Sequence, residues 1–287
     1  MVKKKIAIIT DSTCDIPQAL IEQYAIHVVH HVIIWGEEQY RDRVDMMPDE
    51  FYRRLRTDDS IPTTSQATIA DFAGAYQEVC EQGAESIVVI TVSEKLSGAI
   101  QSARQAAAQS PVPVHIYDSR GATMGLGWQV IAAARAREQG GSETDMLAAA
   151  DRVRKNVHLL ISLDTLEYLG RGGRIGNARR MLGSVLHIKP LIYVDHESGI
   201  VESGGMAMTR NKALDMLYKK FFERLDTSRP MHIAVLHGDA QDDAEALAAR
   251  IREEYNPAEQ VMNITCPALG IHTGPKALAL CGYSESE

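Results

Sequence analysis

Cysteine is scarce in this chain of 287 residues. The four cysteines, Cys14, Cys80, Cys266 and Cys281, lie far apart, and none forms a C-x-x-C pair with another. Small disulfide-stabilised domains have many closely spaced cysteines, and structural zinc sites use paired ones. The sequence therefore argues against a disulfide framework and against a cysteine-based metal or redox site, and we expect reduced thiols.

Long apolar runs are also missing. No segment approaches the ~18 consecutive apolar residues of a membrane helix, and the apolar run near the N-terminus is too short for a secretory signal. The net charge of −8 includes no basic block, which argues against nucleic acid or an anionic membrane surface as the main partner. We therefore expect a cytoplasmic protein that has no membrane span and acts on a small molecule.

Several familiar motifs are absent. The chain contains no G-x-G-x-x-G, no G-x-x-x-x-G-K-[ST] and no G-x-S-x-G, so the corresponding nucleotide sites and hydrolase elbow are not predicted. His27, His30 and His31 lie in the apolar segment AIHVVHHVIIW without the spacing of a zinc site, and we interpret them as partly exposed strand residues. We expect no metal, no cofactor and no catalytic residue.

Short β-branched runs alternate with helical patterns along the chain. Strand-like runs such as IAIIT, SIVVITV and HIAVLHG are followed by polar turns and by helical segments such as ADFAGAYQEVCEQG. This order predicts an α/β protein with parallel sheets flanked by helices. Ligands of such sheets bind beyond the carboxyl ends of the strands, so the loops after the strands are the candidate site.

The chain divides into two predicted domains, residues 1–154 and 155–287. Ser142 is a predicted N-cap with Asp145 three residues later, and the helix that follows leads to a new strand near residue 158. In the second domain, the segment HIKPLIYVDHESGIVESGGMAMT predicts a hairpin of two strands with an exposed turn at residues 197–199.

The loops after the predicted strands are rich in hydroxyl groups. They are TDSTCD at residues 10–15, PTTSQAT at 62–68, SEKLSG at 93–98 and YDSRGATMGLG at 117–127. Each has a structural alternative: Asp11 to Thr13 suit an Asx or Ser/Thr turn, and Thr64, Ser65 or Ser97 could cap the helix that follows. Several hydroxyls that converge without a base would hold an anion rather than break a bond.

Two further loops carry candidate anion donors. In LEYLGRGGRIG, Arg171 and Arg174 surround a pair of glycines, and a guanidinium suits a carboxylate or a phosphate. The alternative is a glycine helix terminus with a solvated arginine, which fits Arg171 better than Arg174. In GIHTGPKAL, His272 lies between glycines in a predicted turn, as a structural residue or as a donor to the same anion.

These segments together resemble one family. ITDSTCDIP, TTSQAT, SEKLSGAIQSA, YDSRGATMGLG, LEYLGRGGRIG, RNKAL, the HG at 237–238 and GIHTGP occur in the order seen in the DegV family of bacterial fatty-acid-binding proteins, over residues 4–283. The resemblance implies two α/β domains that enclose a long-chain fatty acid, and no cofactor besides this ligand. It also implies a separate ATP-binding kinase subunit as partner, transient exchange with membranes and no catalysis by the chain itself.

The resemblance also implies roles for particular residues. Thr64 and Ser97 would hydrogen-bond the fatty-acid carboxylate, Ser65 and Gly98 would shape their loops, and Arg174 and His272 would support the head group. The candidate ligand site therefore comprises Thr64, Ser65, Ser97, Gly98, Arg174 and His272. Arg210, in TRNKAL, resembles the region that meets the kinase subunit, and its alternative is an ordinary helix start.

Two positions depart from the family pattern. Ala67 stands where the family commonly has proline, and Lys276 stands where it commonly has glycine. Lys276 lies close to His272 in sequence, so it would add an anion contact or point to solvent.

Two other functions compete with the carrier. One is a stand-alone phosphotransferase or hydrolase that acts on a small carboxylate or phosphate at the same loops, although no serine is paired with a general base in the sequence. The other is a regulatory module that binds a different lipid.

Overall fold

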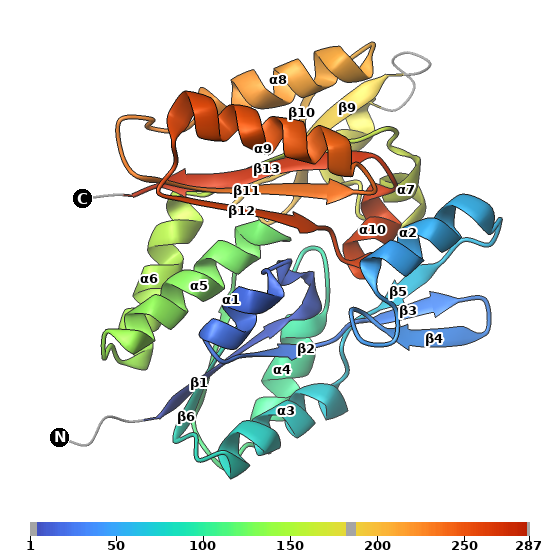
Figure 1. Ribbon diagram of the computed structural model, residues 1–287. Helices are drawn as coiled ribbons and strands as arrows, with labels where there is room; N and C mark the ends of the chain where they lie inside the picture. The colour runs from blue at the N-terminus through green and yellow to red at the C-terminus, as the bar shows by residue number, and fades with distance from the viewer. Residues whose placement is uncertain (1–4, 182–187, 286–287) are drawn as a thin grey trace.

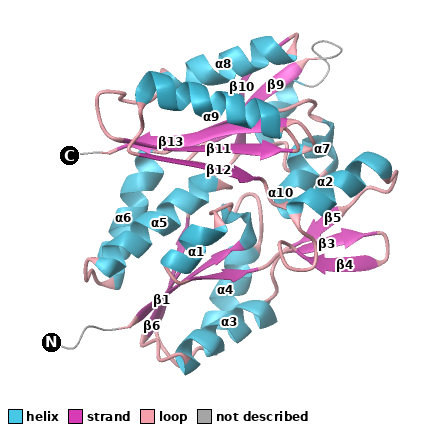
Figure 2. Ribbon diagram, in the orientation of Figure 1, coloured by secondary structure: helices cyan, strands magenta, loops and turns pink. Residues whose placement is uncertain are grey.

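Two large β-sheets with helices between and outside them form the body of the protein, and a small third sheet lies at one side (Figures 1 and 2). The structure, a computed structural model, describes residues 5–181 and 188–285. Over these residues no helix combines the length and the apolar character that crossing a membrane requires.

The elements follow in chain order. The strands are β1 (Ile6–Asp11), β2 (Ile26–Val29), β3 (Val32–Trp35), β4 (Glu38–Arg41), β5 (Thr63–Ser65), β6 (Ser86–Thr91), β7 (Val114–Asp118), β8 (His158–Ser162), β9 (Lys189–Val194), β10 (Val201–Ala207), β11 (Met231–Gly238), β12 (Glu259–Ile264) and β13 (Ala277–Ser284). The α-helices are α1 (Gln18–Gln23), α2 (Pro48–Thr57), α3 (Ile69–Glu81), α4 (Ala99–Ala107), α5 (Met124–Glu138), α6 (Glu143–Asn156), α7 (Glu167–Arg171), α8 (Arg210–Phe222), α9 (Gln241–Tyr255) and α10 (Pro267–Thr273), with 3-10 turns η1 (Ser12–Cys14) and η2 (Gly176–Met181).

The first large sheet has the strand order β2-β1-β6-β7, and all of its pairs are parallel. Every residue of β1 and β6 is buried, as their continuous β-branched runs predict for central parallel strands. Helix α5 contacts β1 and β6 on one side and β8 and β13 of the second sheet on the other. The predicted α/β class with a parallel N-terminal sheet and flanking helices is confirmed.

The second large sheet has the order β10-β9-β8-β13-β11-β12, and only the β11–β12 pair is parallel. The expectation of a parallel sheet is therefore wrong for this half of the chain. The physical reason is that buried strands have the same apolar composition in either direction, whereas the connections decide the direction. The short helix α10 brings β13 back antiparallel to β11 and β8.

Side chains alternate between the two faces of the second sheet. Leu278 and Leu280 of β13 belong to the core under α8 and α9, whereas Ala277 and Ala279 face the first sheet. Figure 1 shows α8 and α9 above this sheet and α5 and α6 below it. Successive residues of a strand point to opposite faces, so β13 presents its leucines to one layer and its alanines to the other.

The predicted hairpin is present as the antiparallel pair β9–β10, with Val201 opposite Val194. Its turn is exposed at Glu197, as predicted, but Gly199 is buried. The Gly199 carbonyl oxygen accepts a hydrogen bond of 2.8 Å from the Ser93 hydroxyl, because the turn packs against the loop after β6. The hairpin therefore ties the two halves of the chain together.

The predicted capping of α6 is also present. The Ser142 hydroxyl accepts from the Asp145 backbone, and the Asp145 carboxylate accepts from the Ser142 N–H in return. All strands of the first sheet end by residue 118, and those of the second begin at residue 158. The boundary after residue 154 lies in the last turn of α6 and stays a prediction.

Lys276 has a backbone conformation that favours glycine. Its φ is +62°, its side chain is exposed, and it does not line the cavity described below. Because a left-handed conformation costs a non-glycine residue about 1–2 kcal/mol, we expect Lys276→Gly to raise the free energy of unfolding by about 0.5–1 kcal/mol, measured by urea denaturation. Lys219→Gly, at an exposed position of α8, should instead lower it by about 1 kcal/mol; an equal loss in both variants would contradict this interpretation.

Candidate functional site

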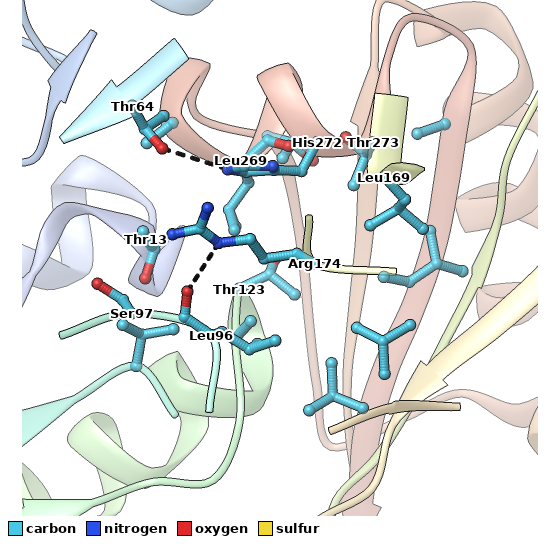
Figure 3. Close-up of a pocket in the computed structure, with 18 of the residues that line it drawn as sticks. Thr13, Thr64, Leu96, Ser97, Thr123, Leu169, Arg174, Leu269, His272 and Thr273 are labelled. Atoms are coloured by element: carbon cyan, nitrogen blue, oxygen red, sulfur yellow. Dashed lines mark hydrogen bonds between the residues drawn. The ribbon is translucent and has the colours of Figure 1, made fainter. Parts of the chain in front are cut away.

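A cavity lies between the loops of the first sheet and the inner face of the second. Its void space, including the part open to solvent, is about 940 Å³. The second sheet contributes only apolar side chains to its lining, namely Ile161, Ile192, Val194, Val201, Leu236, Ala277 and Ala279. Polar side chains gather at the other end (Figure 3).

The carboxyl ends of three parallel strands supply the loops at the polar end. Thr13 follows β1, Ser97 follows β6 and Thr123 precedes α5 after β7, and all three line the cavity. This agrees with the expectation that the loops after the parallel strands form the site.

Thr64 and Ser97 line the same cavity, although 33 positions separate them in the sequence. Thr64 lies on β5, and the N-cap of the next helix is Thr68 rather than Thr64 or Ser65, so that alternative is wrong. Ser97 precedes the N-cap Gly98, and its Oγ accepts from the Ala99 N–H at 3.2 Å. The Ser97 hydroxyl proton is not used in that bond and is free to be donated.

His272 lies on α10, a short helix, rather than in the predicted turn. Its Nε2 is 3.3 Å from Thr64 Oγ1, and its buried Nδ1 has no hydrogen-bond partner among the described residues. Burial, together with the charges of Arg174 and His31, lowers the pKa of His272 to about 4, so the ring is neutral at neutral pH. In the tautomer that has its proton on Nε2, His272 donates to Thr64, whose own hydroxyl proton is then left for a ligand.

Because Gly172 has no side chain, the ring of His272 has room beside it. A Cβ on Gly172 would lie 2.0 Å from His272 Nδ1, whereas a Cβ on Gly170 would meet nothing within 4 Å. We expect Gly172→Ala to lower the free energy of unfolding by about 1–3 kcal/mol because the ring must shift. Gly170→Ala, two positions earlier in helix α7, should be neutral or slightly stabilising in the same urea titration. Equal stability of the two variants would contradict this role.

Arg174 lies between the two groups of hydroxyls. Its Nε donates to the Leu96 carbonyl at 3.0 Å and its Nη1 to the Gly172 carbonyl at 2.8 Å. Neither bond uses Nη2, and Figure 3 shows the guanidinium between Thr64 and Ser97. Arg174 is thereby fixed by backbone oxygens with donors left for an anion.

Arg171 does not share this role. It lies at the end of α7 and forms an ion pair with Glu167 one turn earlier, and both side chains are about half exposed. The interpretation of Arg171 as a solvated arginine at a helix terminus agrees with this position.

Ser65 and Gly98 are not among the residues that line the cavity. Ser65 is exposed in a neighbouring groove that also contains Thr64 and Arg174, because adjacent residues of β5 point to opposite faces. Gly98 leaves room for Gln66, whose side-chain oxygen would lie 2.2 Å from a Cβ at position 98. Both residues are therefore next to the cavity, and a contact with ligand stays a prediction for them.

A buried contact between Asp11 and His31 lies behind the polar end. Asp11 accepts from the Thr13 hydroxyl at 2.5 Å and from the Val92 N–H at 2.8 Å, and its Oδ1 is 3.4 Å from His31 Nε2. Burial by itself would raise the pKa of Asp11, but His31, Thr13 and Val92 hold it below its usual value. The turn predicted at Asp11 to Thr13 is present, since the Thr13 N–H also donates to the Asp11 carboxylate.

The interpretation of His31 as a partly exposed strand residue is wrong. His31 is 4% exposed, it lies in the link between β2 and β3, and it lines the cavity. Burial would lower the pKa of His31, but Asp11 and Asp42 raise it above its ordinary value. The sequence signal for this position was a pair of adjacent histidines, His30 and His31, within an apolar run.

Asp42 is a third buried ionisable residue, beside Asp11 and His31. It accepts from the Ser12 hydroxyl at 2.6 Å and from the Ala268 N–H at the start of α10 at 3.3 Å. Burial raises the pKa of Asp42 to about 6, against the opposing effects of Ser12, Arg43 and His31. Among the described residues, no three histidine, cysteine or acidic side chains gather where a metal ion could bind.

Arg210 is the first residue of α8 and is held within the protein. It forms an ion pair with Asp243, and its Nη1 donates to the Lys276 carbonyl at 2.8 Å. This geometry agrees with the alternative of an ordinary helix start, and a contact with a partner stays a prediction.

The fold and the site define a class of α/β protein: two stacked sheets enclose a cavity that is apolar over the second sheet and polar at the loops of the first. A family model described as "Uncharacterised protein, DegV family" matches residues 5–285. The chain belongs to the DegV family, as the sequence motifs predicted.

Relatives match over nearly their full lengths. A DegV domain-containing protein of Streptomyces coelicolor is 33% identical over 278 residues, covering 96% of this chain and 98% of that protein. The structure titled "Fatty Acid Binding of a DegV family Protein from Thermus thermophilus" is 32% identical, covers 98% of this chain and 100% of that one, and has a TM-score of 0.91. The structure of Bacillus subtilis DegV, described as a fatty acid binding protein, is 27% identical. The match covers 98% of this chain and 100% of that one, with a TM-score of 0.90.

Proposed function

We propose that this chain binds one long-chain fatty acid, with the acyl chain in the apolar part of the cavity and the carboxylate at Thr64 and Ser97. The observation that carries the proposal is that two hydroxyls from distant loops line one end of a cavity whose other end is apolar. Two family members of similar fold are described as fatty-acid-binding proteins, which supports it.

The acyl chain provides the affinity in this proposal. Burying 16 carbons at ~0.8 kcal/mol per CH₂ gives about 11 kcal/mol before the costs of ordering. The hydroxyls then need only orient the head group. In this proposal the Thr64 oxygen accepts from the His272 Nε2–H and the Ser97 oxygen accepts from the Ala99 N–H, so each hydroxyl has a proton to donate.

Arg174 and His272 have supporting roles. Arg174 brings positive charge from the second half of the chain, and His272 orients the Thr64 hydroxyl without adding a charge. Neutral donors together with one backbone-held arginine hold a carboxylate without a full bidentate ion pair, which leaves a carboxylate oxygen open to further reaction.

We further propose that the bound carboxylate is presented to a separate ATP-binding kinase subunit, and that the chain then carries the acyl phosphate. The polar end lies next to a second groove that shares Thr64, Arg174 and His272 with the cavity, which offers a route to the head group from outside. In this proposal the chain has no complete active site of its own, and Arg210 remains a candidate contact for the partner.

Mass spectrometry of the purified protein tests the proposed ligand. We expect denaturation of protein made in bacteria to release a long-chain fatty acid at about one per chain. An empty chain that fails to bind added palmitate, or one that turns over phosphatase or esterase substrates, would overturn the proposal.

The head-group residues are tested separately. We expect Thr64→Val and Ser97→Ala each to weaken palmitate binding about tenfold, because each removes a donor to a charged group. Thr227→Val, at an exposed position far from the cavity lining, is the matched control and should bind as the unmodified protein does. Unchanged affinity in both head-group variants would exclude these residues as the carboxylate site.

A further inference from the structure

His31 is a buried titratable side chain that the proposed head-group site does not yet use. It lines the cavity together with Thr13, Thr64 and Ser97, and its Nε2 faces Asp11 Oδ1 at 3.4 Å, so the nitrogen left for a ligand is Nδ1. A polar ring that is 4% exposed is costly to bury unless its nitrogens have partners.

The surroundings of His31 favour its charged form. Asp11 lies 3.4 Å from Nε2, and Asp42 on the loop after β4 also attracts the positive charge. Arg174 opposes it from the second half of the chain. Burial lowers the pKa of His30, and it lowers the pKa of His272 to about 4. These surroundings favour the protonated form of His31, which would add a second positive charge beside Arg174 at the polar end of the cavity.

We propose that His31 is a head-group binding residue, whose protonated ring donates its remaining N–H to the ligand carboxylate while Asp11 holds its Nε2 side. This rests on the proposed fatty-acid function and adds a charged donor from the first half of the chain, facing Arg174 from the second. A charged imidazole has two N–H donors, so one side can face Asp11 and the other the ligand.

The position of Asp11 supports the same assignment. Its carboxylate is held by Thr13 and Val92, which also line the cavity, and so fixes the ring from behind. Asp11 is a positioning residue in this arrangement, comparable with the carboxylate that orients a histidine in many sites. Asp11 thereby connects His31 to Thr13 and Val92, two other residues at the polar end of the cavity.

The proposal predicts a pH dependence with a definite sign. A raised pKa means that His31 is protonated at low pH and loses its charge as the pH rises through that value. Affinity for palmitate should therefore be highest below the pKa and fall above it. Affinity for hexadecanol, which has no charge, should not follow this fall.

The test compares palmitate and hexadecanol binding by the full chain between about pH 6 and about pH 9. We expect His31→Gln to bind palmitate about tenfold to a hundredfold more weakly at the low end of this range, and to lack the fall seen in the unmodified protein. The matched control is His27→Gln, at a half-buried position of β2 outside the cavity lining, which should keep the normal profile.

A second measurement covers the case in which His31→Gln does not fold. Calorimetry in buffers of different ionisation enthalpy should show proton uptake when palmitate binds to the unmodified protein above the pKa of His31. Palmitate binding with no proton uptake, or with the same pH profile in His31→Gln, would overturn the role of His31. A protein that binds neither palmitate nor hexadecanol would instead overturn the fatty-acid function itself.

Discussion

We expect Ala279→Phe to weaken palmitate binding by about a hundredfold. Ala279 lies on β13 and faces the cavity, whereas its neighbours Leu278 and Leu280 face α8 and α9. A phenyl ring at this position would occupy space for about three or four methylene groups of the ligand. At ~0.8 kcal/mol per buried CH₂, the loss is about 3 kcal/mol.

Ligand length makes this prediction specific. If the ring blocks the apolar part of the cavity, decanoate should lose less affinity than palmitate, because fewer of its carbons reach the blocked part. Binding is measured by calorimetry, with urea denaturation to show that the variant is folded. Ala249→Phe, on the exposed face of α9, is the control for added aromatic surface; equal palmitate affinity in both variants would refute the placement of the acyl chain.

We expect Asp15→Ala to lower the free energy of unfolding by about 3–5 kcal/mol, because it leaves a largely buried arginine without its partner. Asp15 is fully buried and joins segments that are far apart in the sequence. Its Oδ1 accepts from Arg43 Nη2 at 2.8 Å and from the Cys266 N–H at 2.9 Å. Its Oδ2 accepts from the Thr123 hydroxyl at 2.7 Å.

A double variant separates the ion pair from the other contacts. Asp15→Ala combined with Arg43→Leu should be more stable than Asp15→Ala alone, because the unpaired charge is gone. Glu167→Ala, which breaks the exposed pair with Arg171, should change stability by less than about 1 kcal/mol in the same urea titration. A loss at Asp15→Ala no larger than at Glu167→Ala would show that this buried carboxylate does not stabilise the fold.

Local sequence patterns predicted the elements and several of their details. The continuous β-branched runs of β1 and β6, the capping box at Ser142 and Asp145, and the β9–β10 hairpin are all present. Each depends on residues close together in the chain, so composition and spacing are enough to indicate them.

Errors arose where distant segments decide the outcome. The direction of β8 in its sheet depends on β9 and β13, and the burial of His31 depends on Asp11, Asp42 and the loops around them. No pattern within AIHVVHHVIIW distinguishes a ring that faces solvent from one that faces a cavity. His272 was likewise placed in a turn, because the proline at which its helix begins was not recognised in the sequence.

The sequence by itself determined that this is an α/β protein of the DegV family with hydroxyl-rich loops after its parallel strands. Only the tertiary structure decided that Thr64, Ser97 and His31 share one wall, that Ser65 lies outside it, and that the alanines of β13 leave space behind them. The physical reason is that hydrogen bonding and chain stiffness act between neighbours and leave a local signature, whereas a cavity is the space left when two sheets pack, and each sheet is built from strands far apart in the chain.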